Sequence, residues 1–226
     1  MKRSSLALPG IVLAALLLGS CTSKITKPEQ YSGFLSDYSR LERAESASGY
    51  PVMRWIAPGF RPENYRQVLV KSIRFYPTPE PTKQISAKTL DDLQKYLSDK
   101  VTAAFSRRYT VGPLTSAQEE AIPASQTLIL RAAITGVSTG VKPLRPYEVL
   151  PIAIAAAATM TLIGERNQNT ELFVEAELID ASTGQPVVQV VRKGYGKELS
   201  SRRQQLSLEN LKGVIDTMVR DIEQFR

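Results

Sequence analysis

The stretch TELFVEAELIDASTGQPVVQVVRKGY, residues 170–195, decides the fold expected of this chain. In its first half apolar residues alternate with others, so successive side chains point to opposite faces, as in a β-strand. Residues 181–185, ASTGQ, are rich in turn formers and separate this run from a second one that is rich in valine. We therefore predict a β-hairpin made of residues 170–180 and 186–195.

The first predicted strand of this hairpin has one apolar face and one mainly acidic face. The apolar side consists of Leu172, Val174, Ala176 and Leu178. The other side consists of Glu171, Phe173, Glu175, Glu177 and Ile179. Together with Asp180, the carboxylates would suit a catalytic or calcium site, but the alternation favours a solvent-facing strand surface, with Arg192 and Lys193 across the hairpin.

Two amphipathic helices are predicted, at residues 89–107 and 208–225, because apolar residues recur there at helical spacing. Thr89 and Ser207 are the expected N-caps. The spacing of the second helix also fits a coiled-coil seam, but it covers too few heptads for a sustained coiled coil. We therefore expect this helix to pack on the sheet of its own domain.

Further strands are predicted at residues 66–76 and 126–139, the second broken near Gly136, with a short one at 109–111. Pro77 ends the first of them, because proline cannot donate to a strand ladder. The predicted fold class is therefore α+β: a mainly antiparallel sheet of four or five strands, with two long helices on one face and an irregular N-terminal arm before it.

The alanine-rich run at residues 149–163 is shorter than the roughly 20 residues that a membrane-spanning helix needs. A buried helix or loop is the first interpretation. Shallow membrane insertion and self-association through the small side chains are the alternatives.

The first twenty residues have the features of an export signal. Lys2 and Arg3 precede an apolar run, and the small residues Gly19 and Ser20 lead to Cys21. The ending LGSC, residues 18–21, resembles the bacterial lipobox, which implies cleavage before Cys21 and acylation of that cysteine with chains such as palmitate. An ordinary signal peptide with an incidental cysteine is the alternative, but Cys21 is the only cysteine in the chain, which favours the anchor.

The residue after the cysteine is Thr22 and not aspartate, which by resemblance to the sorting rule of many Gram-negative lipoproteins predicts the periplasmic face of the outer membrane. The inner membrane, also facing the periplasm, is the alternative. The predicted organisation is a signal peptide at 1–20, a tether at 21–30, an aromatic arm at 31–65 and one domain at 66–226. Since the nine residues 22–30 reach at most about 30 Å when fully extended, the domain should stay close to the bilayer.

The composition excludes several classes of site. The chain has no histidine, so His-based catalysis and His-ligated metals are excluded, and an acylated Cys21 leaves no free thiol. The net charge of +7 falls to +5 when Lys2 and Arg3 leave with the signal. We interpret this charge as favouring solubility, with attraction to anionic lipid as a second interpretation. No catalytic residue, metal, cofactor or nucleic-acid partner is predicted.

The arm contains the candidate partner-binding residues. They are the aromatic and apolar side chains Tyr31, Phe34, Leu35, Tyr38 and Trp55. Such a segment must either pack on its own domain or form a recognition surface for another protein, and the first is the simpler expectation.

The segment SGFLSDYSRL, residues 32–41, is followed by IAPG at 56–59 and by YRQVLV at 65–70. This combination resembles the bacterial lipoproteins grouped as domain of unknown function 3313. The likeness extends from the lipobox through most of the chain. It implies a lipoprotein, but it brings no established activity and no catalytic residues.

Three functions remain open. The first is a non-enzymatic, membrane-anchored interaction protein or accessory subunit of a cell-envelope assembly. The second is a carrier or sensor of an apolar ligand, with residues 149–163 at the entrance of its pocket. The third is an envelope enzyme that uses carboxylate or Ser-Lys chemistry, with the candidate residues Glu171, Glu175, Glu177, Lys193 and Ser200. The sequence makes no prediction of the oligomeric state.

Overall fold

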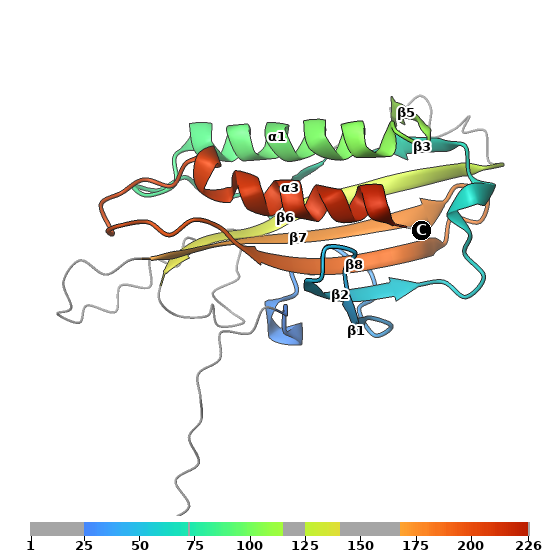
Figure 1. Cartoon of the computed structure of the whole chain (residues 1–226), viewed down its shortest axis with the longest axis horizontal. Coiled ribbons are helices and arrows are strands. Elements are labelled where there is room, and N and C mark those ends of the chain that lie inside the picture. Colours follow the sequence, from blue (N-terminus) through green and yellow to red (C-terminus); the bar gives the residue numbers. More distant parts are fainter. Residues whose placement is uncertain (1–24, 72, 115–124, 141–167, 226) are drawn as a thin grey trace, which may run out of the picture.

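The computed structural model of the chain describes residues 25–71, 73–114, 125–140 and 168–225 (Figure 1). The signal peptide, Cys21 and the alanine-rich run at 149–163 therefore lie outside the described residues. The described residues form an eight-stranded mixed sheet with two long helices on one face (Figure 1). The predicted α+β class is confirmed, but the prediction of four or five mainly antiparallel strands was wrong, because the sheet is larger and mixed.

The predicted hairpin lies in the middle of the sheet, as β7 (Asn169–Asp180) and β8 (Pro186–Tyr195). Strand β6 (Thr127–Gly140) pairs antiparallel with β7, and its register shifts between Ile134 and Gly136, where the sequence pattern predicted a break. A Cβ atom on Gly136 would lie 2.9 Å from the Phe173 ring, so this close approach of the two strands requires glycine.

The sheet is mixed because the strands on one side of β6 run parallel to it. The single strand expected at 66–76 is two short strands, β3 (Gln67–Val70) and β4 (Arg74–Phe75), and both pair parallel with β6. Strand β5 (Thr110–Pro113) pairs parallel with β3 and forms that edge of the sheet. Helix α1 (Ala87–Phe105) lies between β4 and β5 in the chain, as a connection between parallel strands requires.

The N-terminal arm is not irregular throughout, which corrects the prediction. It contains two strands, β1 (Glu42–Glu45) and β2 (Pro51–Ile56), and the short 3-10 helix η2 (Pro62–Asn64). A second 3-10 helix, η1 (Pro28–Gln30), lies just before the arm, at the end of the predicted tether. Strand β2 pairs with β8, and β1 pairs with β2 at the other edge of the sheet. The local pattern did not reveal these strands, because the ladder that stabilises β2 belongs to β8, far along the chain.

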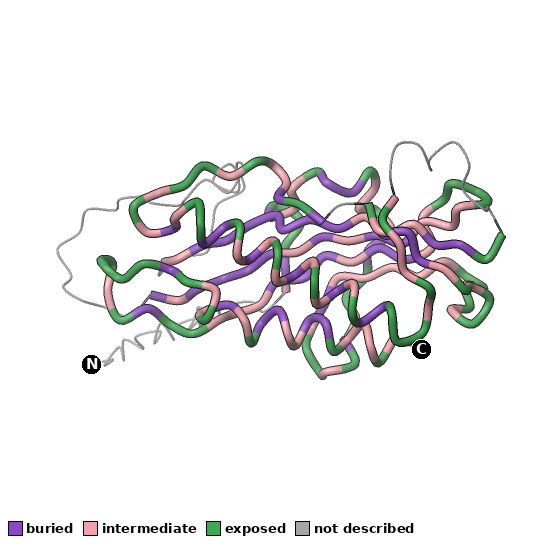
Figure 2. The backbone as a smooth tube through the Cα atoms, turned by 90° about the horizontal axis from the view of Figure 1, so that it is seen from above, coloured by how far each residue is buried: buried purple, intermediate pink, exposed green. Residues whose placement is uncertain are grey.

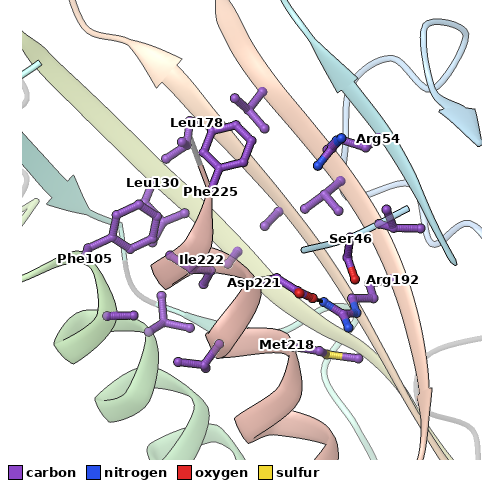
Figure 3. Close-up of a pocket in the computed structure, with 18 of the residues that line it drawn as sticks. Ser46, Arg54, Phe105, Leu130, Leu178, Arg192, Met218, Asp221, Ile222 and Phe225 are labelled. Atoms are coloured by element: carbon purple, nitrogen blue, oxygen red, sulfur yellow. Dashed lines mark ion pairs between the residues drawn. The ribbon is translucent and has the colours of Figure 1, made fainter. Parts of the chain in front are cut away.

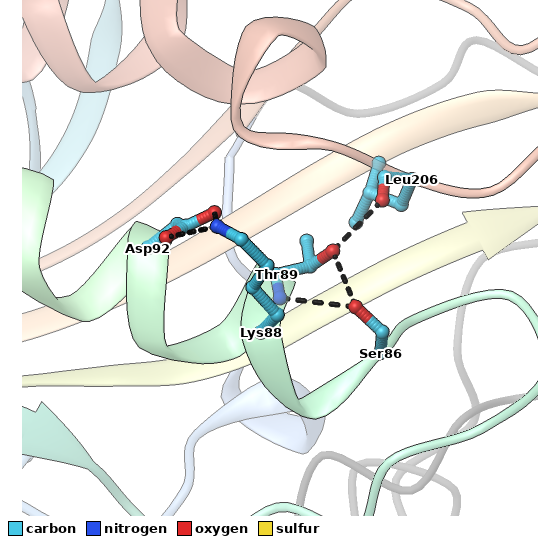
Figure 4. Close-up of polar contacts among 5 residues, drawn as sticks. All are labelled: Ser86, Lys88, Thr89, Asp92 and Leu206. Atoms are coloured by element: carbon cyan, nitrogen blue, oxygen red, sulfur yellow. Dashed lines mark hydrogen bonds and ion pairs between the residues drawn. The ribbon is translucent and has the colours of Figure 1, made fainter.

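Helix α1 begins two residues before the predicted start. Its N-cap is Ser86, whose Oγ accepts a hydrogen bond from the Thr89 backbone N–H at 3.1 Å (Figure 4). Thr89 lies inside the helix, where its hydroxyl donates to the Leu206 carbonyl at 3.1 Å. Helix α3 (Leu208–Gln224) is capped by Ser207, as predicted.

Both helices bury one apolar face against the sheet. The buried residues of these faces include Leu90, Leu93, Leu97 and Val101 of α1 and Leu211, Ile215 and Met218 of α3. They pack with the apolar side of the central strands. The buried residues along these strands are purple in Figure 2. Burial of each such side chain stabilises the fold by about 1.5–3 kcal/mol. As predicted, α3 packs on its own domain.

Candidate functional site

A cavity of about 450 Å³ opens on the helix-covered face of the sheet, between the C-terminal halves of α1 and α3 and the strands β2, β7 and β8 (Figure 3). Small-molecule sites commonly have volumes of about 300–1,000 Å³. The cavity arises because the helices do not cover this part of the sheet. Val174 and Ala176 are only half-buried although β7 is a central strand, whereas Leu172 on the same side is fully buried beneath the helices.

The walls of the cavity are mainly apolar. The helices and their ends contribute Leu97, Val101, Phe105, Met218, Ile222 and Phe225, and the strands contribute Val52, Ile56, Leu130, Val174, Ala176, Leu178, Val188 and Val190. The lining residues of β7, Val174, Ala176 and Leu178, lie on the strand face that the sequence predicted to be apolar. Since burial of apolar surface is favourable and non-directional, such walls suit an apolar group of a ligand.

One charged pair in the wall is neutralised within the protein. Arg192 of β8 forms an ion pair with Asp221 of α3, and both side chains are largely buried (Figure 3). The other carboxylate oxygen of Asp221 accepts the Ser48 backbone N–H at 2.7 Å. Burial lowers the pKa of the Arg192 guanidinium to about 10, so it stays charged at neutral pH. The pair therefore joins the arm to α3 and does not offer a free charge to a ligand.

A second arginine in the wall has no such partner. Arg54 lies on β2 between Val52 and Ile56 on the cavity side of the strand, and its side chain is half-buried (Figure 3). Within the described part of the chain its guanidinium forms no hydrogen bond or ion pair. Its cross-strand neighbour on β1 is Glu42, which is exposed and does not line the cavity. The cavity thus combines apolar walls with the Arg54 guanidinium, which a ligand can reach.

The opposite face of the sheet carries the acidic row of β7, and the prediction that this row faces solvent was wrong. Glu175 is 0% exposed, and Glu171 and Glu177 are also buried. For Glu175 the physical reason is that the N-terminal arm packs over it. The carboxylate of Glu175 accepts the Ser32 backbone N–H at 2.8 Å and the Tyr38 hydroxyl at 2.5 Å.

The other two carboxylates are paired within the sheet. Glu171 lies 2.9 Å from the Lys193 ammonium, on the neighbouring strand, as predicted. The same prediction was wrong for Arg192, which lies on the other face and pairs with Asp221. Glu177 lies 2.5 Å from the Arg131 guanidinium of β6 and accepts from the Gln189 side-chain amide at 3.1 Å. Burial raises the pKa of Glu175, which has no cationic partner among the described residues, above its ordinary value of 4.5.

The structure brings together the candidate partner-binding residues of the arm. Phe34 and Leu35 are buried against the sheet, beside Ala133 and Val191. Tyr31 and Tyr38 are half-buried and stack with ring centroids 4.6 Å apart. Trp55 is half-buried on β2, with the Arg40 guanidinium 3.9 Å from its ring centroid. Phe34 and Leu35 therefore cannot contact another protein while the arm is docked, and partner binding by the exposed parts of the others stays a prediction.

The candidate residues of a carboxylate or Ser-Lys enzyme do not share a cavity. Glu171, Glu175 and Lys193 lie on the arm-covered face, and the Ser200 hydroxyl bonds to Gln204 in an exposed loop. Glu177 borders the cavity, but its carboxylate is bonded to Arg131 and Gln189. In the described segments no three Cys, Asp or Glu residues gather in an arrangement that could hold a metal ion. None of the helices described is long and apolar enough to cross a bilayer.

The sequence did not single out the cavity or Arg54. The signal that could have revealed Arg54 is the alternation in PVMRWI, which places it between Val52 and Ile56 on an otherwise apolar strand face. A lone arginine at such a position either finds a partner or faces a site. This signal required β2 to be recognised as a strand. The predicted pocket entrance, residues 149–163, lies outside the described residues.

The chain is similar to a protein from Escherichia coli strain K12, "Uncharacterized lipoprotein YdcL", with 39% identity over 229 residues that cover all of this chain and 98% of that protein. Among solved structures, the PelC dodecamer from Paraburkholderia phytofirmans has 16% identity and a TM-score of 0.42, covering 77% of this chain and 97% of that one. Lipoprotein GNA1162 from Neisseria meningitidis has 12% identity and a TM-score of 0.34, with 70% and 96% covered. Likenesses this distant carry no inference about function or assembly.

The family comparison extends over most of the described fold. The model of the family "Protein of unknown function (DUF3313)" matches residues 30–222, from the arm to the end of α3. This match agrees with the resemblance seen in the arm, and the full-length relative adds the lipoprotein character. The chain therefore belongs to the DUF3313 family, as a lipoprotein of unknown function.

Proposed function

We propose that this lipoprotein is a non-enzymatic, membrane-anchored binding protein that carries or senses an apolar ligand in its cavity. The observation that carries this proposal is the cavity of about 450 Å³, whose walls are mainly aliphatic and aromatic. Such an open cavity beside the packed core leaves apolar surface only partly buried, including that of Val174 and Ala176. A ligand that fills it would recover that burial.

A membrane anchor suits a protein that binds apolar ligands. A lipid on Cys21 would hold the domain on the periplasmic face of the outer membrane, as proposed from Thr22. The tether is short, so the cavity would stay near the bilayer, where apolar ligands are concentrated. The proposal assigns no catalysis, because the carboxylates of the described residues that border the apolar walls are bonded to partners or exposed.

A fluorescent apolar probe tests this proposal. N-phenyl-1-naphthylamine should bind the purified protein with enhanced emission, and Ala176→Trp, which fills the cavity from β7, should weaken binding at least about tenfold. Val190→Phe, on β8, should have the same effect if Ala176→Trp does not fold. The matched control is Ala103→Trp, at an exposed position of α1, which should bind like the parent. Equal binding by all folded variants would refute the proposal.

A second candidate function is docking of an envelope protein on the arm, as an accessory subunit would need. The half-buried Tyr31–Tyr38 stack and the Trp55–Arg40 pair favour it, because rigid aromatic and arginine side chains dominate binding energy at protein interfaces. A photocrosslinking residue at position 31 should yield one defined adduct in cells, and the same residue at position 95, on α1, should not. Identical adduct patterns at both positions would exclude this surface.

A further inference from the structure

The charged residues that line the cavity indicate which class of ligand it can bind. Of the charged residues that line it, Arg192 and Asp221 neutralise each other, Glu177 is bonded to Arg131, and Glu45 of β1 is exposed to solvent. The Arg54 side chain has no hydrogen-bond or ion-pair partner among the described residues. The apolar walls are therefore bordered by the Arg54 guanidinium, which no described side chain neutralises, and a ligand that matches both features would be apolar along its length and anionic at one end.

The positions of these charged residues suit a ligand with one apolar chain and one anionic head group. Arg54 and the Arg192–Asp221 pair lie at different places along the wall, with apolar side chains between them (Figure 3). Arg108, at the end of α1, also lines the cavity and donates to the Phe225 carbonyl at 2.5 Å. That bond satisfies a carbonyl at the negative end of the α3 dipole, which would otherwise disfavour an anion nearby.

We propose that the cavity binds a long-chain carboxylate, with the acyl chain against the apolar walls and the carboxylate on Arg54. This inference rests on the proposed function. A cavity of about 450 Å³ has the size for one small-molecule ligand. The guanidinium presents paired N–H donors that match the two oxygens of a carboxylate, and such charge-assisted bonds are stronger than neutral ones.

Displacement of N-phenyl-1-naphthylamine by three amphiphiles of equal chain length tests which head group the cavity prefers. Laurate should displace the probe about tenfold more tightly than 1-dodecanol, as a charge-assisted hydrogen bond predicts, and dodecyltrimethylammonium should be the weakest. Arg54→Gln should remove the preference for laurate and leave the affinity for 1-dodecanol unchanged. Arg54→Lys should retain part of it, because lysine keeps the charge and loses the paired donors.

The control is Arg43→Gln, on the neighbouring strand β1 at an exposed position outside the cavity, which should keep the full preference. Equal affinities for laurate and 1-dodecanol, or an unchanged preference in Arg54→Gln, would overturn the inference and leave the proposed function intact. Tighter displacement by lauroyl-lysophosphatidylglycerol than by laurate would overturn the carboxylate assignment. Failure of the probe itself to bind would instead refute the proposed function.

Discussion

Glu175 shows how one residue links the arm to the sheet. Its carboxylate is fully buried and accepts hydrogen bonds from Ser32 and Tyr38, two residues of the arm. Unlike Glu171 and Glu177, it has no ion-pair partner among the described residues, and burial raises its pKa. The ionised carboxylate is therefore stabilised by hydrogen bonds alone, and its protonation state should affect how firmly the arm is held.

The raised pKa predicts a pH dependence of stability. A carboxyl group whose pKa is higher in the folded chain contributes stability that is fully present below its ordinary value of 4.5. That contribution is lost as the pH rises through the folded pKa. On going from pH 7 to pH 5, the free energy of unfolding should rise for the parent relative to Glu175→Gln, by up to about 1.4 kcal/mol per unit of pKa difference.

Urea unfolding followed by the fluorescence of Trp55, the only tryptophan of the chain, measures this difference at each pH. Trp55 packs with the cluster that contains Phe34 and Leu35, so it reports on the region of the arm. Glu42→Gln, at an exposed position, is the control and should follow the parent. Parallel pH profiles for the parent and Glu175→Gln would show that Glu175 does not titrate in this range.

At the scale of elements, the contact between α3 and the end of β8 depends on two glycines. A Cβ atom on Gly194 would lie 2.3 Å from the Val214 side chain. One on Gly196 would lie 2.2 Å from the Asn210 backbone carbonyl oxygen. A side chain can rotate away, but the helix backbone cannot do so without moving α3. Gly196 therefore sets how closely the start of α3 approaches the sheet.

We predict that Gly196→Ala lowers the free energy of unfolding by about 1–3 kcal/mol, because overpacking forces the backbone to shift. The matched control is Gly213→Ala in α3, where a Cβ atom would meet no atom within 4 Å. That change should stabilise the protein by up to about 1 kcal/mol, because alanine favours the helix. Thermal unfolding of the two variants should shift in opposite directions, and equal shifts would contradict this account of the contact.

At the scale of the whole molecule, a lipid on Cys21 would set the position of the cavity in the cell. The relative with 39% identity is a lipoprotein, and Cys21 is the only cysteine available to carry the lipid here. Cys21→Ser should abolish labelling by a palmitate analogue and release the mature chain from the membrane fraction or leave its signal uncleaved. Ser23→Ala should label normally, and normal labelling of Cys21→Ser would refute the anchor. Thr22→Asp should move the protein to the inner membrane if the proposed sorting applies.

The elements that could be predicted are those with a strong local pattern. The β7–β8 hairpin, the apolar face of α1 and the Ser207 cap of α3 follow from residue spacings within one element. The elements that were missed, β1 and β2, are short and flanked by glycine and proline. Strand β2 pairs with β8, more than a hundred residues away in the chain, which no local pattern records, and β1 in turn pairs with β2.

The sequence by itself determined the alternation that forms the central hairpin and the lack of histidine that excludes whole classes of catalysis, and it predicts the export signal with Cys21. Only the tertiary structure decided that the acidic row of β7 is buried, since Ser32 and Glu175 meet across 143 residues. It also decided that Arg54 borders an apolar cavity. The physical reason is that periodicity specifies the two faces of a strand, whereas burial depends on which distant segment covers each face.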